Sequence, residues 1–195
     1  MYKWNAEYRI IDDFLEPEDF EKCKSYFAND FDGQEVIVEG QTYNFANRAA
    51  VNEIHIDKEN KIEGFDVSDP YVLELFIKYK DKVFDLMKEL APEKLDDYKT
   101  SVIEFVETPK GYEHELHCDH INKLLSIVIY ISPDKNTGTI LYKDKNGLDP
   151  YPLDWRPNRA FVFSRNDDSW HNFKNNHDHI RNTITWSLTP PLHQT

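Results

Sequence analysis

The part of the chain after Pro92 consists of short segments rich in β-branched and aromatic residues, separated by clusters of Pro, Gly, Asn and Asp. This pattern is typical of an antiparallel β-sandwich or jelly roll. The segment 124–131, LLSIVIYI, is apolar on both faces, which predicts a central strand that is buried on each side. We therefore expect a mostly β fold with strands at 101–107, 113–119, 124–131, 139–142, 159–164, 169–173 and 181–188.

The first half of the chain is predicted to support this β core with helices. Residues 8–15 indicate a short strand, and the acidic turn at 16–19 predicts the start of a helix. Between residues 70 and 90, apolar side chains recur at helical spacing with Lys residues between them, which indicates an amphipathic helix packed on a sheet. Residues 30–63 follow no regular pattern, and we assign them no role.

The length of 195 residues and the hydrophobic content of 39% suit one well-filled domain. We expect a single domain over residues 1–195, with supporting strands and helices over 1–98 and a β core over 99–190. The formal net charge of −13 opposes binding to phosphate backbones, so nucleic acid is not an expected partner.

Cysteine usage and hydropathy indicate the cellular setting. Cys23 and Cys118 are the only cysteines, which are too few for a disulfide framework and favour a reducing, cytoplasmic compartment. No stretch approaches the roughly 20 apolar residues of a membrane span. Residues 1–7 lack the apolar region of a signal peptide. We therefore expect a cytoplasmic protein with no membrane partner.

Three residues form the strongest candidate for a metal site. In an extended chain, residues i and i+2 point to the same side, so His117 and Asp119 can reach one ion while Cys118 points away. His171, in the predicted strand 169–173, is the preferred third ligand. Two histidines and one carboxylate can occupy one face of an iron(II) octahedron, which leaves positions for a cosubstrate and oxygen.

The other histidines are weaker candidates. His114 and His117 are one residue short of the His-Glu-x-x-His spacing of a zinc protease, and the surrounding pattern does not predict the helix that this motif needs. We interpret His114 and His120 as solvated neighbours of the site. His177 and His179 lie in a segment with the composition of a turn and are expected to face water.

Arg181 begins a strand in which odd positions are polar and even positions are apolar. Such a strand turns its polar face either toward water or toward the interior of a barrel that binds an anion. In the second case the guanidinium group can hold a carboxylate through two parallel hydrogen bonds. The strand alone does not decide between these alternatives.

Taken in order, these residues resemble the iron(II)- and 2-oxoglutarate-dependent dioxygenases, and most closely the prolyl 4-hydroxylase-like branch. The resemblance covers about residues 100 to 188 and rests on His117-Cys118-Asp119, the buried segment 124–131, the segment 138–142 (GTILY), His171 and Arg181. It implies a double-stranded β-helix, or jelly-roll, core with the N-terminal helices packed on its major sheet.

The resemblance also implies roles for single residues. Three would bind iron(II), namely His117, Asp119 and His171. Others would hold the distal carboxylate of the cosubstrate 2-oxoglutarate, namely Arg181, Tyr130 and, as in some branches of the family, Thr183. The tyrosine that the family often has upstream of the first ligand falls near Phe105 or Glu107 in this chain. A contact from such a tyrosine is therefore not expected.

The implied activity is hydroxylation of a C–H bond in a small molecule or a peptide side chain, with consumption of O2 and release of succinate and carbon dioxide. Two alternatives stay open. A cupin-like metalloprotein would bind metal without 2-oxoglutarate, and a catalytically silent β-sandwich binding module would bind neither. The affinities for metal and for 2-oxoglutarate distinguish the three.

Overall fold

A six-stranded antiparallel sheet forms the main layer of the computed structural model, which describes residues 2–29, 49–58 and 70–191 but not the side chains of 49–57. The strand order is β1-β7-β4-β9-β3-β2. Most of the unassigned segment 30–63 lies outside the described residues. The six strands are β1 (Tyr8–Ile11), β2 (Ala49–Asp57), β3 (Thr100–Thr108), β4 (Leu125–Ser132), β7 (Ala160–Ser164) and β9 (Arg181–Thr189).

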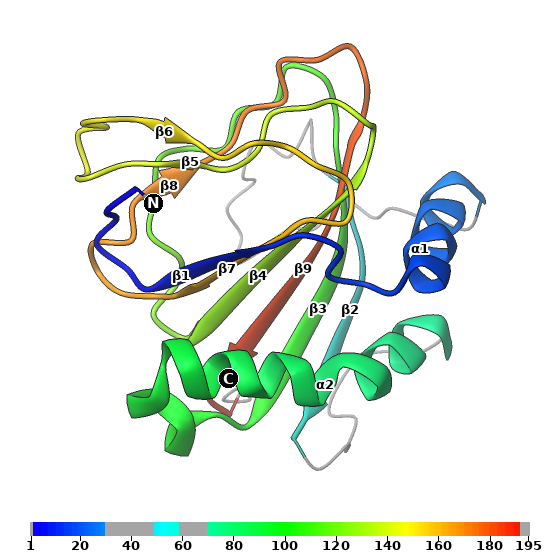
Figure 1. Ribbon diagram of the computed structural model, residues 1–195, viewed down its shortest axis with the longest axis horizontal. Helices are drawn as coiled ribbons and strands as arrows, with labels where there is room; N and C mark the ends of the chain where they lie inside the picture. The colour runs from blue at the N-terminus through cyan, green and yellow to red at the C-terminus, as the bar shows by residue number, and fades with distance from the viewer. Residues whose placement is uncertain (1, 30–48, 59–69, 192–195) are drawn as a thin grey trace, which may run out of the picture.

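A second, three-stranded sheet has the order β6-β5-β8 and consists of β5 (Ile140–Leu141), β6 (Tyr151–Pro152) and β8 (His171–Asn172). Figure 1 shows this small sheet at the upper left of the large one. Two isolated bridges, Glu113 with Lys174 and His117 with His171, continue the strand pairing beyond β8. The large sheet and these bridged segments together surround the residues of the candidate site.

The predicted strand at 113–119 is wrong. This segment pairs with another part of the described chain only at the two isolated bridges. In this segment the carbonyl group of Glu115 accepts a 2.8 Å hydrogen bond from the ring of His117, a local bond that a regular strand would not make. The segment therefore follows an irregular path, and the alternation of side chains that a strand would impose does not hold.

The longest predicted strands are confirmed. Segments 101–107, 124–131 and 181–188 correspond to β3, β4 and β9, and β4 pairs with β7 on one side and with β9 on the other. Most side chains of β4 are buried, as expected for a central strand. The segments 139–142, 159–164 and 169–173 contain the shorter strands β5, β7 and β8. The sequence predictions did not include β2, β6 or the short 3-10 helix η1 (Pro92–Asp97).

Two helices, α1 (Pro17–Asn29) and α2 (Pro70–Leu90), share one apolar core with residues of the large sheet. In Figure 1, α1 lies at the right and α2 along the lower edge. The apolar face of α2 shares one core with the even positions of β9, and Phe76 contacts Trp186 with ring centroids 5.7 Å apart. No helix in the described part of the chain combines the length and apolar character needed to cross a membrane.

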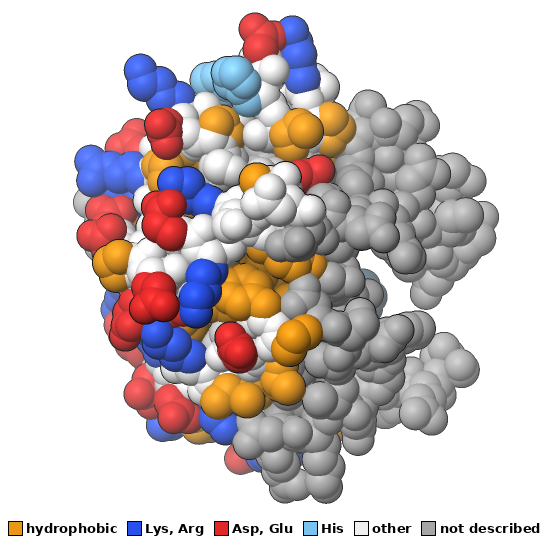
Figure 2. Space-filling model, turned by 90° about the vertical axis from the view of Figure 1, so that its right-hand side faces the viewer, with side chains coloured by type: hydrophobic (Ala, Val, Ile, Leu, Met, Phe, Trp, Pro, Cys, Tyr) orange, Lys and Arg blue, Asp and Glu red, His pale blue; other side chains and the backbone are white. Residues whose placement is uncertain are grey.

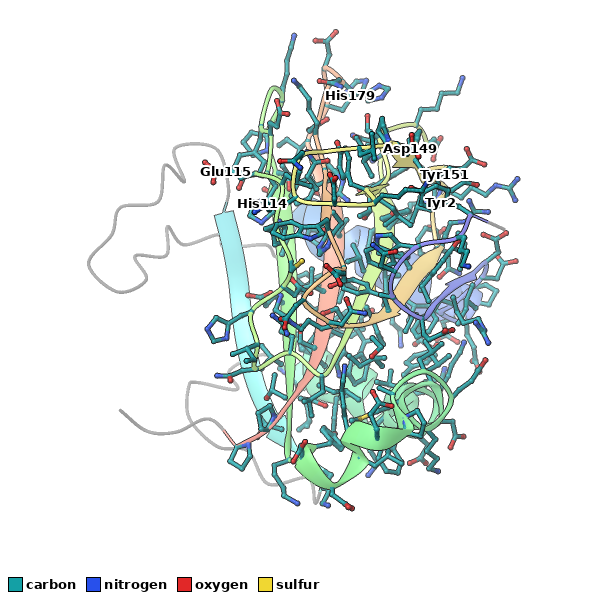
Figure 3. All side chains as sticks on the ribbon, turned by 90° about the vertical axis from the view of Figure 1, so that its left-hand side faces the viewer. Tyr2, His114, Glu115, Asp149, Tyr151 and His179 are labelled. Carbon is teal, nitrogen blue, oxygen red and sulfur yellow. The ribbon has the colours of Figure 1, made fainter. Side chains whose placement is uncertain are left out.

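The N-terminal segment forms a second apolar cluster between β7 and the small sheet. Its residues are Trp4, Ala6, Tyr8, Leu141, Leu153, Phe161 and Phe163. At the outer end, Tyr2 stacks on Tyr151 of β6 and donates a hydrogen bond to the carbonyl of Asp149 (Figure 3). The N-terminal residues thus hold the small sheet in place beside the large one.

Acidic and basic side chains are interspersed around a hydrophobic area on the face shown in Figure 2. Within the described residues, this face has no broad area of positive charge.

Candidate metal centre

His117, Asp119 and His171 lie together at one cavity between the large sheet and the segments around β8. Their potential ligand atoms all lie within 4.8 Å of one another. Reciprocal main-chain hydrogen bonds of 3.0 and 2.9 Å join His117 to His171 and bring their rings to a centroid distance of 4.4 Å. The structure therefore brings together the three residues that the sequence predicted as metal ligands.

The hydrogen bonds of the two histidines determine which ring nitrogen can bind a metal. Nδ1 of His117 lies 2.8 Å from the carbonyl oxygen of Glu115, and Nδ1 of His171 lies 2.8 Å from that of Ser169. Because a carbonyl oxygen only accepts, each Nδ1 carries the proton and each Nε2 presents a lone pair. Burial also lowers the pKa of His171 to about 4, so this imidazole is neutral near pH 7.

Asp119 is buried and held from both sides. Ser126 on β4 donates a 2.5 Å hydrogen bond to Oδ2, and the ammonium group of Lys123 lies 3.2 Å from Oδ1. Burial by itself would raise the pKa of Asp119, but the charge of Lys123 and the hydrogen bond from Ser126 hold it well below its usual range. The side chain is therefore a carboxylate, the form that ligates a metal ion.

These donors fit iron(II). Two neutral imidazole nitrogens and one carboxylate oxygen on the same side of an ion are the set typical of non-haem iron(II), with further positions left for other ligands. The atoms of these side chains that would not bind the metal are held by hydrogen bonds, because each Nδ1 and the Oδ2 atom already have a protein partner. The site is organised around a position that three side chains can share.

Arg181 is buried at the start of β9, and its guanidinium carbon lies 4.4, 5.2 and 5.6 Å from the ring centroids of Phe173, Trp155 and Tyr130. Its Nε atom is 3.4 Å from the carbonyl oxygen of Thr137. A cation at the wall of a cavity with this aromatic surrounding attracts an anion strongly, because little water screens it.

Four polar residues of β9 line the cavity, and three apolar residues between them belong to the core that contains the helices. The cavity-lining residues of this strand are Arg181, Thr183, Thr185 and Ser187. Those in the core with α1 and α2 are Ile184, Trp186 and Leu188. The alternative that the sequence left open is thereby decided in favour of an interior polar face.

Tyr130 and Thr183 are neighbours across β4 and β9, but their side chains are placed differently. Thr183 lines the cavity, whereas the hydroxyl group of Tyr130 is bonded to Thr139: it donates to Oγ1 at 3.1 Å and accepts from the main-chain nitrogen at 2.9 Å. Thr139, which the sequence did not single out, is itself a cavity-lining residue. A role of Tyr130 toward a carboxylate stays a prediction.

His114 is a neighbour of the site, as interpreted, but it is less exposed to solvent than expected. His114 is half-buried and lines the cavity, with ring centroids 4.4 Å from His117 and 5.3 Å from Phe173. A regular strand with His117 facing inward would have turned His114 outward, but the irregular path of this segment turns it inward. His120 is exposed, as expected.

The two histidines of the turn before β9 do not belong to the cavity wall. His179 is exposed, and Figure 3 shows it at the outer end of this loop, away from His114. The sequence predicted that His177 faces water, but in the structure it is half-buried. Neither is part of the group that could hold a metal among the described residues.

The sequence did not identify two charged residues that line the cavity, Glu104 on β3 and Lys123 before β4. The alternation in β3 carried a signal for Glu104, since this acid stands between buried apolar residues of a predicted strand. Lys123 carried none, because its role depends on the position of Asp119.

No protein-family model matches the sequence, and no curated protein matches it. Solved structures do match the fold. One is a Pseudomonas putida prolyl-4-hydroxylase, with 12% identity, a TM-score of 0.61 and coverage of 96% of this chain and 95% of that chain. Another is the dioxygenase for auxin oxidation 1 from Arabidopsis thaliana in complex with 2-oxoglutarate, with 14% identity, a TM-score of 0.63 and coverage of 97% and 84%.

A third match is the viral collagen prolyl hydroxylase from Paramecium Bursaria Chlorella virus-1, with 9% identity, a TM-score of 0.57 and coverage of 95% of this chain and 96% of that chain. At such identities the likeness concerns the fold, over nearly the whole of this chain. The chain therefore has the fold of prolyl 4-hydroxylases and related 2-oxoglutarate oxygenases, the group that its sequence resembles.

Proposed function

We propose that the chain is an iron(II)- and 2-oxoglutarate-dependent oxygenase that hydroxylates a C–H bond in a small molecule or a peptide side chain. The observation that carries this proposal is the meeting of His117, Asp119 and His171 with the buried Arg181 in a single cavity. Neighbours in fold that were solved with 2-oxoglutarate, and one prolyl hydroxylase solved with a peptide, support the cosubstrate and the kind of substrate.

In this proposal the strands that residues 99–190 contribute to the two sheets form a jelly-roll core, and β1 and β2 extend the large sheet on either side, in one domain that spans 1–195. The shared apolar core of α1, α2 and the large sheet supports the expected packing of the helices on the major sheet. Both cysteines are free thiols, which supports the expected reducing, cytoplasmic setting.

The protein side of the chemistry begins with the metal ligands. His117 and His171 would bind iron(II) through Nε2, and the carbonyl groups of Glu115 and Ser169 would keep both rings in this orientation. Asp119 would bind through its carboxylate, which Ser126 orients. Bound iron(II) with 2-oxoglutarate and O2 supplies the oxidant for an unactivated C–H bond, while the cosubstrate leaves as succinate and carbon dioxide.

Arg181 would bind the distal carboxylate of 2-oxoglutarate and so determine how far the cosubstrate extends from the metal. The rings of Phe173, Trp155 and Tyr130 would keep water from this ion pair. Thr183 and Thr139 offer hydroxyl groups at the cavity wall nearby. Tyr130 would become a donor to the same carboxylate by exchanging its bond with Thr139.

The test measures the affinities for metal and 2-oxoglutarate, and then the oxygen-dependent formation of succinate. We expect His117→Ala and Asp119→Ala to abolish succinate formation, because each removes a ligand, and the exposed His120→Ala to leave it unchanged. Full turnover in either ligand variant would reject the metal assignment. Metal binding without 2-oxoglutarate binding would favour the cupin-like alternative, and binding of neither would favour the silent module.

Arg181→Ala tests the cosubstrate site separately. This change should raise the 2-oxoglutarate concentration at half-saturation about tenfold or more, since a charge-assisted pair in a cavity is lost. Metal affinity should be retained. An unchanged half-saturation would reject the role of Arg181.

A further inference from the structure

We propose that Glu104 determines specificity by binding a cationic group of the substrate, an amine or a guanidinium. This inference rests on the proposed function and names the substrate class for the same site. Glu104 is half-buried on β3 and lines the cavity that contains the candidate metal ligands. It is a carboxylate at this cavity that neither metal binding nor cosubstrate binding uses.

The strand register keeps the side chain of Glu104 on the cavity face. Glu104 is directly opposite Thr185 of β9, which in turn is opposite Val128 of β4. The hydroxyl group of Thr185 donates a 2.6 Å hydrogen bond to Oε2 of Glu104. Because a carboxylate has about four acceptor sites, this single bond orients the group and leaves capacity for a ligand.

The other charged groups at the cavity already have functions. The carboxylate of Asp119 is bonded to Ser126 and Lys123, and the ammonium group of Lys123 lies 3.2 Å from it. Arg181 is four residues from Thr185 along β9, at the end of the cavity assigned to 2-oxoglutarate. Among the described residues that line the cavity, Glu104 is therefore the charge left for the substrate. A partly buried carboxylate is stabilised when a cation joins it.

The distance between Glu104 and the metal ligands limits the size of the substrate. Ser126, which donates a hydrogen bond to Asp119, lies on β4, two strands away from Glu104. Along β4 it is two residues from Val128, the residue in line with Glu104 across the sheet. With strands about 4.8 Å apart and a rise of about 3.4 Å per residue, the two Cα atoms are about 12 Å apart. Both side chains project from the same face of the sheet, so this separation sets the approximate upper limit, about 12 Å, for the distance between the cation and the oxidised carbon. Free basic amino acids and Lys or Arg side chains have this size.

The first stage of the test separates this inference from the proposed function. The affinities for Mn(II), as a redox-stable substitute for iron(II), and for 2-oxoglutarate are measured for the natural chain, for Glu104→Gln and for Glu107→Gln. Glu107 lies on the same strand but is not a cavity-lining residue, so it provides a matched control. Failure of the natural chain to bind Mn(II) and 2-oxoglutarate would refute the proposed function, and this inference with it.

The second stage measures binding of cationic and matched neutral probes to the Mn(II)–2-oxoglutarate form by ligand-observed NMR. The pairs are lysine with norleucine and arginine with citrulline, each as the free amino acid and within a short peptide. We expect at least one cationic probe to bind the natural chain about tenfold or more tightly than its neutral partner. Glu104→Gln should lose this preference, because its amide keeps the bond to Thr185 but has no charge, and Glu107→Gln should retain it.

Two results would overturn the proposal while leaving the metal and cosubstrate sites intact. One is a natural chain that binds no cationic probe better than its neutral partner. The other is a preference for the cation that persists in Glu104→Gln.

Discussion

Ser126 on β4 donates a 2.5 Å hydrogen bond to Oδ2 of Asp119. Asp119 lies in an irregular segment, whereas Ser126 belongs to the central strand of the large sheet. This bond therefore ties a candidate metal ligand to a strand that is paired on both sides. The geometry of such a ligand is therefore sensitive to substitution of a residue that contacts the ligand but not the metal.

Ser126→Ala should lower the affinity for Mn(II) or iron(II) about tenfold to a hundredfold, the usual range for loss of a residue that orients a ligand. The measurement is a metal titration followed by fluorescence or calorimetry. Ser132→Ala is the control, because this serine lies on the same strand and its hydroxyl group instead accepts a bond from Asn182. Equal metal affinities of the two variants would contradict the role of Ser126.

Trp4→Phe should destabilise the fold by about 0.5–1.5 kcal/mol, since the part-buried carbonyl groups of Tyr142 and Trp170 lose a hydrogen bond from the indole. Nε1 of Trp4 lies 3.0 Å from the carbonyl oxygen of Tyr142 and 3.3 Å from that of Trp170, next to β5 and β8. Its ring also meets the edge of His171 at a centroid distance of 6.2 Å. Urea unfolding gives the free energy of unfolding. The comparison is Tyr2→Phe, which loses an exposed bond, and an equal loss in both variants would refute the explanation.

Gly138→Ala should destabilise the chain by about 1–3 kcal/mol through overpacking. A Cβ atom at this position would lie 2.2 Å from the carbonyl oxygen of Leu153 and 3.3 Å from the hydroxyl group of Tyr130. The comparison is Gly111→Ala, where the new atom meets nothing within 4 Å but φ is +79°. That variant should lose about 1 kcal/mol from backbone conformation alone. Thermal unfolding of both variants measures the difference, and a smaller loss for Gly138→Ala would contradict the steric reason.

Asp12→Asn should lower stability at pH 7 by less than about 1 kcal/mol, because the aspartate is partly exposed and screened by solvent. Arg159 contacts both carboxylate oxygens, at 2.5 and 3.0 Å, and these hydrogen bonds lower the pKa of Asp12 below 3.8. The folded state thus favours the charged carboxylate, and its stabilising effect is complete above the unfolded pKa and is lost as the pH falls through the lower folded pKa.

The difference in stability between Asp12→Asn and the natural chain should therefore shrink when urea unfolding is repeated at pH 3. The exposed neighbour Asp13→Asn provides the control for a change of charge at this position of the chain. A difference for Asp12→Asn that is the same at pH 7 and pH 3 would exclude the ion pair with Arg159 as its cause.

The amino-acid sequence alone determined those features that depend on local pattern. The apolar run in β4 and the helical spacing in α2 are visible without any partner, because burial on both sides or on one face imposes its own period. The His-x-Asp pair and His171 could be selected as metal ligands because their chemical types and order restrict the choice. The mostly β character of the second half could likewise be predicted from its short β-rich segments before any strand was paired.

Only the tertiary structure decided which way the polar residues face. The alternation in β9 is the same whether Arg181 meets water or a cavity, and the packing of Trp186 against α2 selects the cavity. The inward turn of His114 and the position of Glu104 opposite Thr185 also depend on contacts between segments far apart in the chain. A local pattern carries no information about such contacts, because it gives the spacing of side chains along a segment but not the neighbour that the segment will meet.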